Sequence, residues 1–112
     1  MIILGIDPGI ARMGWGVIDH EKGKTHAVNY GCFETSARGP LPYRLTALKQ
    51  EMVRIIDHYK PSKAGIEQLF FNTNTKTAMT VGQARGVIIE TLAERNIPIE
   101  SFTPLQVKLA VT

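Results

Sequence analysis

Two carboxylates, Asp7 and Glu67, stand where a short apolar run gives way to a turn or a loop. Asp7 follows the run 2–6 and precedes a Pro-Gly turn, and Glu67 follows the run 63–66. A short apolar run closed by turn residues indicates a buried strand. Each acid is therefore predicted at the C-terminal end of a strand, and the two would converge if those strands are neighbours.

Converging carboxylates would suit a hard cation, because Mg²⁺ prefers oxygen ligands and keeps water and substrate phosphate in its shell. We therefore expect Mg²⁺ as the cofactor, with Mn²⁺ as a substitute. Such cations activate water and stabilise the leaving oxygen of a phosphodiester, which would make Asp7 and Glu67 ligands rather than bases. Taken singly, each acid also has an ordinary explanation, as a residue capping a turn for Asp7 and as a surface residue at a strand edge for Glu67.

The pattern of apolar and turn residues predicts an α/β fold, a mixed sheet with flanking helices. Besides the two strands that end in acids, strands are predicted at 14–19, 25–33 and 97–102. The first three strands of the chain are expected to form an antiparallel meander. Cys32 is the single cysteine of the chain, so an intrachain disulfide is excluded and a buried, reduced thiol is expected.

Two amphipathic helices are predicted between these strands. The first begins near residue 41 and ends before Pro61, because apolar residues recur at helical spacing up to that point. The second is expected to begin at Asn74 or Thr75 and to run to about Arg95, and a third helix would start near residue 103. The small residues at 82 and 86 would let another helix, or the chain's own sheet, pack closely against the second helix.

The composition is that of a folded protein with one core, since 44% of the 112 residues are hydrophobic and 21% are charged. One domain, residues 1–112, is expected. A net charge of +3 fits a nucleic-acid-binding protein but also many others. The opening apolar run is too short for a signal peptide and no stretch reaches membrane-spanning length, so we expect a cytoplasmic protein.

Four segments, in this order, resemble the RuvC-type Holliday junction resolvases. They are GIDPG at 5–9 with Gly14 beyond it, IEQLF at 66–70, GQARG at 82–86 and PLQVK at 104–108. The opening motif also occurs in actin-like kinases and other ribonuclease H relatives. The second and third motifs are therefore the ones that distinguish RuvC-type resolvases from these relatives. The resemblance covers almost the whole chain and implies a ribonuclease H-like fold.

This resemblance implies a metal-dependent crossover junction endodeoxyribonuclease, which resolves four-way DNA junctions in homologous recombination and repair. Asp7 and Glu67 match the first two catalytic acids of the family. The family's two later acids lie beyond the Lys108 helix, so the chain is expected to be a nuclease domain incomplete at its C-terminus, lacking the C-terminal helical part. Family members act as homodimers and work with a branch-migration helicase complex, and both are implied partners.

The resemblance also implies contacts with DNA. Phe70 matches an aromatic residue near the junction centre, where stacking on an unpaired base is worth about 1–3 kcal/mol, and its neighbour Phe71 could assist. Further candidates for sugar and phosphate contacts are polar or basic: Asn72, Asn74, Lys76, Arg12, Arg85 and Lys108. Ordinary alternatives remain for this set, namely a phenylalanine packed in the core, solvated basic side chains, or an ion pair between Arg85 and Glu90.

Three other interpretations compete with an active resolvase. An actin-like ATP-binding domain would use the opening motif as a phosphate turn, but it needs a second, similar half. A catalytically inactive fragment would at most bind branched DNA, and cleavage of a junction with Mg²⁺ separates it from the enzyme. A ribonuclease H-like nuclease of RNA maturation would share the two acids but not the details of the second and third motifs.

Overall fold

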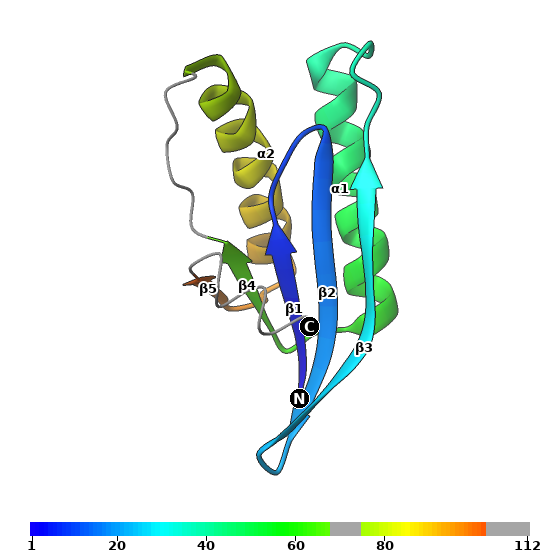
Figure 1. Cartoon of the computed structure of the whole chain (residues 1–112), viewed down its shortest axis with the longest axis vertical. Coiled ribbons are helices and arrows are strands. Elements are labelled where there is room, and N and C mark those ends of the chain that lie inside the picture. Colours follow the sequence, from blue (N-terminus) through cyan, green and yellow to red (C-terminus); the bar gives the residue numbers. More distant parts are fainter. Residues whose placement is uncertain (68–74, 103–112) are drawn as a thin grey trace.

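The computed structural model describes the backbone of residues 1–67 and 75–102 and the side chains of residues 1–67 and 78–100. Its strands form one sheet in the order β3-β2-β1-β4-β5, and two helices pack on a single face of that sheet (Figure 1). The strands are β1 (Ile2–Asp7), β2 (Arg12–Glu21), β3 (Lys24–Glu34), β4 (Lys63–Glu67) and β5 (Ile99–Phe102), and the helices are α1 (Leu41–Tyr59) and α2 (Thr75–Glu94).

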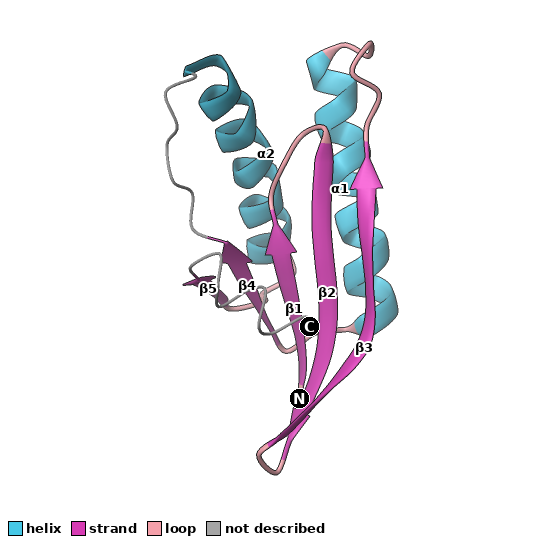
Figure 2. Cartoon of the chain, in the orientation of Figure 1, coloured by secondary structure: helices cyan, strands magenta, loops and turns pink. Residues whose placement is uncertain are grey.

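The first three strands form the predicted antiparallel meander, whereas β4 runs parallel to both β1 and β5. Strands β2 and β3 are longer than predicted. They continue to a two-residue turn at Lys22 and Gly23, whose φ angles of 52° and 75° suit the twist of a tight hairpin. This part of the hairpin extends beyond the other strands (Figure 2), and its exposed, charged residues give no alternating pattern from which a strand could be predicted.

Both helices end as the sequence predicts. At the end of α1, Lys60 adopts the left-handed conformation and its N–H donates to the carbonyl of Ile56 at 2.8 Å. Pro61 follows, and a proline cannot continue a helix. After α2, Asn96 has a φ of 58° and the N–H of Ile97 donates to the carbonyl of Leu92 at 3.0 Å. The spacing of apolar residues and prolines was therefore enough to locate both ends.

The core lies between the sheet and the two helices, and β1 is the central strand of the sheet. Leu4 and Ile6 of β1 and Met13 and Val17 of β2 face the helices and are buried, whereas the edge strand β3 has no buried residue. The opposite face of the sheet is only partly covered by the described residues. On that face, Ile3 and Gly5 of β1 are half-buried. The core residues shared by the two layers include Leu4, Ile6, Val17, Ala64 and Ile66 from the strands, Leu48, Met52 and Ile55 from α1, and Ala84, Ile88 and Leu92 from α2.

Candidate metal centre

Asp7 and Glu67 are the last residues of two adjacent, parallel strands. The register pairs Ile6 with Ile66, so the acids are the next residues along on each strand. Since Ile6 and Ile66 point into the core and side chains alternate along a strand, both acids lie on the opposite face of the sheet. The prediction that two strand ends bring these carboxylates together is confirmed.

The two carboxyl groups interact directly. A hydrogen bond with Asp7, the partial burial of the group and the negative charge of Asp7 together raise the pKa of Glu67 from its ordinary value of 4.5 to about 7. A hydrogen bond between two carboxyl groups requires that one of them carries a proton. The sheet therefore holds two acids closer together than their charges favour, and a cation in place of that proton would relieve the repulsion.

An all-oxygen donor set of this kind fits Mg²⁺ or Mn²⁺ better than zinc, which prefers nitrogen and sulfur ligands. The described residues contain no cluster of three or more histidine, cysteine or acidic side chains that could hold a metal ion. A third acid, Glu100 on β5, forms an ion pair with Lys63 on β4 instead, at 3.8 Å. The candidate centre in this part of the chain is therefore a pair of carboxylates.

Two glycines fit closely around Asp7. Gly14 is its partner across the β1–β2 ladder, and a Cβ at position 14 would lie 3.5 Å from the Cβ of Asp7 and 4.0 Å from its Oδ2. A methyl group would fit there, whereas a larger side chain would reach the carboxylate. A Cβ at Gly9 would lie 2.2 Å from the carbonyl oxygen of Arg12, so the turn after Asp7 closes only with glycine at that position.

Arg12 lies at the start of β2, where the turn that follows Asp7 ends. Its side chain is 71% exposed, and its Nε contacts Oε1 of Glu34 at 3.5 Å and Sγ of Cys32 at 3.4 Å. Cys32 is exposed, so the expectation of a buried thiol is wrong. The reason is that β3 is an edge strand, and Cys32 alternates with Gly31 and Phe33, which face the helices.

The other predicted DNA contacts are placed only in part. Arg85 is half-buried on α2, and the partner suggested for it, Glu90, forms an ion pair with Lys49 of α1 at 2.9 Å. Lys76 lies in the first turn of α2, but its side chain is outside the described set. The remaining candidates fall outside the described residues: Phe70, Phe71, Asn72, Asn74 and Lys108.

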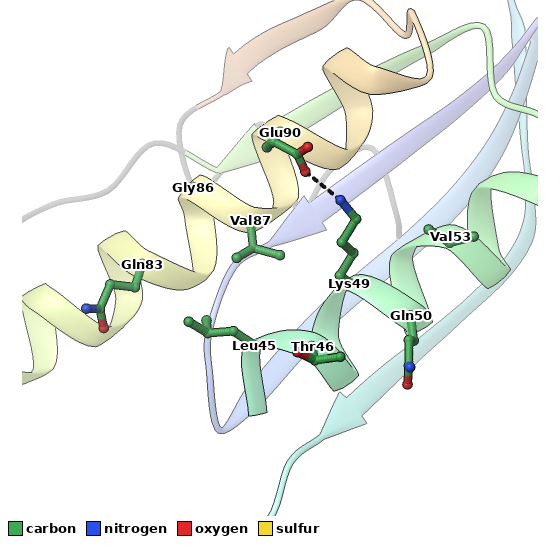
Figure 3. A pocket seen from close by; sticks show the side chains of 9 residues that line it. All are labelled: Leu45, Thr46, Lys49, Gln50, Val53, Gln83, Gly86, Val87 and Glu90. Carbon is green, nitrogen blue, oxygen red and sulfur yellow. Dashed lines mark hydrogen bonds and ion pairs between the residues drawn. The ribbon is translucent and has the colours of Figure 1, made fainter. Parts of the chain in front are cut away.

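The glycines of α2 face away from the sheet. No atom of the described residues lies within 4 Å of a Cβ built at Gly82 or Gly86, apart from the helix's own backbone and chain neighbours. The alternative in which they pack against the chain's own sheet is therefore wrong for this part of the chain. Gly86 lines a groove of about 700 Å³ between the two helices (Figure 3). Its walls are formed by Leu45, Thr46, Lys49, Gln50 and Val53 of α1 and by Gln83, Gly86, Val87 and Glu90 of α2.

Neither helix, as far as its residues are described, is long and apolar enough to cross a membrane.

Comparison with known proteins gives one consistent family. The sequence model described as crossover junction endodeoxyribonuclease RuvC matches residues 3–112. The crossover junction endodeoxyribonuclease RuvC of Finegoldia magna is 47% identical over 111 residues, covering 99% of this chain and 68% of the relative. The protein of the same name from Brevibacillus brevis is 48% identical over 112 residues, covering 100% of this chain and 68% of the relative.

A solved structure, T. thermophilus RuvC in complex with Holliday junction substrate, has a TM-score of 0.88 at 27% identity and covers 97% of this chain and 70% of that chain. The predicted ribonuclease H-like fold is thus confirmed. The chain spans about two thirds of the length of its relatives, and the matched range contains both acids and all four motifs. The match favours the resolvase interpretation over an actin-like ATP-binding domain or an RNA-maturation nuclease.

Proposed function

The chain belongs to the RuvC family of crossover junction endodeoxyribonucleases, and we propose that it supplies the nuclease core of an enzyme that resolves Holliday junctions in homologous recombination and repair. The observation that carries this proposal is the hydrogen-bonded pair of Asp7 and Glu67 at the ends of adjacent parallel strands. The pair lies within the range that matches the family. Its position at the carboxyl ends of strands also suits an active site on an α/β sheet.

The family consists of metal-dependent nucleases, and we propose Mg²⁺, replaceable by Mn²⁺, as the ion that Asp7 and Glu67 hold. A bound ion of this kind activates water and neutralises charge on the phosphodiester. The protein's part is to present two carboxylates on a rigid sheet. The family resemblance implies two further acids, which lie in the portion of the relatives that these 112 residues do not cover.

Contacts around this centre would recognise the junction. Arg12 is exposed beside the turn that follows Asp7, and we propose that it contacts a phosphate near the bond that is cut. Phe70 and Phe71 are proposed to stack on bases at the junction centre. The other contacts proposed to hold the DNA backbone are Asn72, Asn74, Lys76, Arg85 and Lys108.

Resolving a four-way junction requires two strands to be cut, and two copies related by a two-fold axis would present two matching sites. We therefore propose a homodimer that uses the groove between α1 and α2. The groove has apolar walls at Leu45, Val53 and Val87, and Gly86, which lines it, leaves room for the backbone of a second copy (Figure 3). A branch-migration helicase complex is proposed as a further partner, and the cytoplasm, where bacterial DNA lies, as the location.

The test uses a synthetic four-way DNA junction and a linear duplex of the same sequence. Two proteins are compared, the 112-residue chain and a version continued to full length with the remaining segment of the Brevibacillus brevis relative. Each is assayed for binding without metal and for cleavage with and without Mg²⁺. We expect both proteins to prefer the junction over the duplex, and the longer one to cut it only with Mg²⁺.

Matched variants of the longer protein assign the acids. Asp7→Asn and Glu67→Gln should each slow cleavage by at least about 100-fold while leaving metal-free junction binding within about threefold, because they remove ligands and not DNA contacts. Glu100→Gln, an acid of the neighbouring strand that pairs with Lys63, should cut normally. If the two ligand variants cut as fast as the control, or if neither protein distinguishes the junction from the duplex, the proposal is wrong.

A further inference from the structure

Thr35 joins the turn after Asp7 to the start of the first helix, and neither the motifs nor the proposed chemistry give it a role. It follows β3 directly. Its hydroxyl group donates a hydrogen bond to the carbonyl oxygen of Ile10 at 2.5 Å, and its backbone N–H donates to the carbonyl oxygen of Ala11 at 3.1 Å. One residue thus holds two consecutive carbonyl groups of the turn.

These two carbonyl groups belong to the segment that connects Asp7 to Arg12. The turn is anchored from within by Ile10, whose side chain is 7% exposed and belongs to the core. It is closed tightly at Gly9, where no side chain would fit. The bonds from Thr35 fix the last two residues before Arg12, so they determine where that arginine leaves the turn.

Arg44, in the first turn of α1, completes the connection. Its Nε donates a hydrogen bond to Oγ1 of Thr35 at 3.1 Å. Because that oxygen accepts from Arg44, the hydroxyl hydrogen is directed at the carbonyl of Ile10. The aliphatic part of Arg44 lies beside Gly39, where a Cβ would be 3.5 Å from its Cγ. The turn is therefore tied through Thr35 to the helix.

We propose that Thr35, oriented by Arg44, is a positioning residue that fixes the Asp7–Arg12 turn, so that the carboxylate and the guanidinium reach the same phosphodiester. This inference rests on the proposed function. Thr35 does not touch the substrate itself. It acts by preventing small displacements of the two groups, and in enzymes a misplacement of about 1 Å can slow a reaction by up to about 100-fold.

The first test measures the turn without reference to catalysis, by amide hydrogen exchange of the 112-residue chain. Thr35→Val keeps the shape of the side chain and removes its donor. We expect the amide of residue 35, which donates to the carbonyl of Ala11 at 3.1 Å, to lose about tenfold of its protection in Thr35→Val and to regain it in Thr35→Ser. Thr91→Val is the matched control, because it removes the same kind of bond, from Thr91 Oγ1 to the carbonyl of Val87 at 2.7 Å, away from the turn.

The second test uses single-turnover cleavage of a four-way junction by the version continued to the relatives' length. Thr35→Val should slow cleavage about tenfold and raise the Mg²⁺ concentration needed for half of the maximal rate. Metal-free junction affinity should change by less than about twofold, and Thr35→Ser should restore the rate. A loss of stability alone would not produce this separation of rate from affinity, nor its rescue by serine.

Three outcomes decide between the possibilities. If Thr35→Val leaves the protection of the residue-35 amide unchanged, or slows cleavage no more than Thr91→Val, the inference is overturned. If Thr35→Val fails to fold, Arg44→Gln replaces it, and a selective rise in exchange at the amide of Thr35 is still expected. If exchange responds as expected but no version cuts a junction, the proposed function is wrong while the restraint on the turn stands.

Discussion

At the scale of single residues, the acid pair makes the stability of the metal-free protein depend on pH. Glu67 has a pKa of about 7 in the folded chain and its ordinary value of 4.5 when unfolded. Between these values the folded state binds the proton more tightly than the unfolded state. The free energy of unfolding should therefore fall as pH rises from 5 to 8, by about 1 kcal/mol after allowing for solvent screening.

Urea titrations of the metal-free chain at several pH values measure this fall. Glu67→Gln should remove it, whereas Glu100→Gln should keep it. Added Mg²⁺ should recover the lost stability at pH 8 more than at pH 6, because the metal replaces a proton and binds more tightly as pH rises. A stability that is flat between pH 5 and 8 in the unmodified chain would mean that the two carboxyl groups do not share a proton.

Arg12 gives a second residue-scale prediction. As a phosphate contact it should matter equally for every DNA sequence, so Arg12→Gln should weaken junction binding about five- to tenfold and lower the slope of log affinity against log salt concentration by about one. Its exposed neighbour Glu34 competes with phosphate for the guanidinium at 3.5 Å. Glu34→Gln should therefore strengthen binding, by no more than about fivefold, since exposed ion pairs are weak.

Salt titrations of junction binding by fluorescence anisotropy would measure both changes. Lys24→Gln is the control, because it removes the same charge at a distant position. Lys24 is the first residue of β3, next to the hairpin turn, whereas Glu34 is the last residue of that strand. Equal effects of Arg12→Gln and Lys24→Gln would show that only net charge matters and that Arg12 has no special position.

At the scale of elements, one aromatic contact holds the long β2–β3 hairpin to α1. The indole of Trp15 lies over Gly31, its partner across the ladder, and its ring centroid is 5.9 Å from that of Tyr59 on α1. The hydroxyl of Tyr59 in turn accepts a hydrogen bond from Asn29 at 2.6 Å. A Cβ at position 31 would lie 2.7 to 2.9 Å from three indole atoms, so only glycine leaves room for the ring.

Gly31→Ala should therefore lower the free energy of unfolding by about 1–3 kcal/mol, because overpacking displaces the indole from Tyr59. Chemical denaturation followed by tryptophan fluorescence measures both the stability and the environment of Trp15. Gly14→Ala on the adjacent strand is the control, since its Cβ would lie at an ordinary 3.5 Å from its neighbour. If the two variants are equally stable, the fit between ring and glycine does not hold the hairpin to the helix.

Elements whose residues are buried on one side could be predicted from the sequence, and those fixed by distant contacts could not. Apolar spacing and Pro61 gave the bounds of α1, and short apolar runs placed Asp7 and Glu67 at strand ends. The exposure of Cys32 cannot be predicted in this way, because a strand pattern does not say which strand lies at the edge of the sheet. The contacts of Thr35 cannot be predicted from the sequence, because its partners, 24 and 25 residues earlier in the chain, become neighbours only once β3 is paired with β2.

At the scale of the whole molecule, the proposed dimer groove and the acid pair lie on opposite sides of the sheet. One face is covered by α1 and α2, and the acids lie on the other. A partner that binds in the helical groove would leave the acids free to meet DNA. Dimer formation and catalysis should therefore be separable by mutation, and a variant that blocks the groove should keep the fold and the acid pair.

The substitution Gly86→Leu should separate dimer formation from catalysis. Apart from its chain neighbours and the backbone of its own helix, no described atom lies within 4 Å of a Cβ added at Gly86. Leucine also favours helix over glycine by up to about 0.8 kcal/mol. The fold should therefore be unchanged or slightly stabilised. The larger side chain would block the close approach of a second copy.

Sedimentation equilibrium between 1 and 100 µM should show a dimer for the unmodified chain but a monomer for Gly86→Leu. The control is Ala93→Leu, which should remain a dimer because position 93 is exposed on α2 outside the groove. A dimer of unchanged affinity in Gly86→Leu would place the interface elsewhere, because an isobutyl group cannot be accommodated in a contact that depends on glycine.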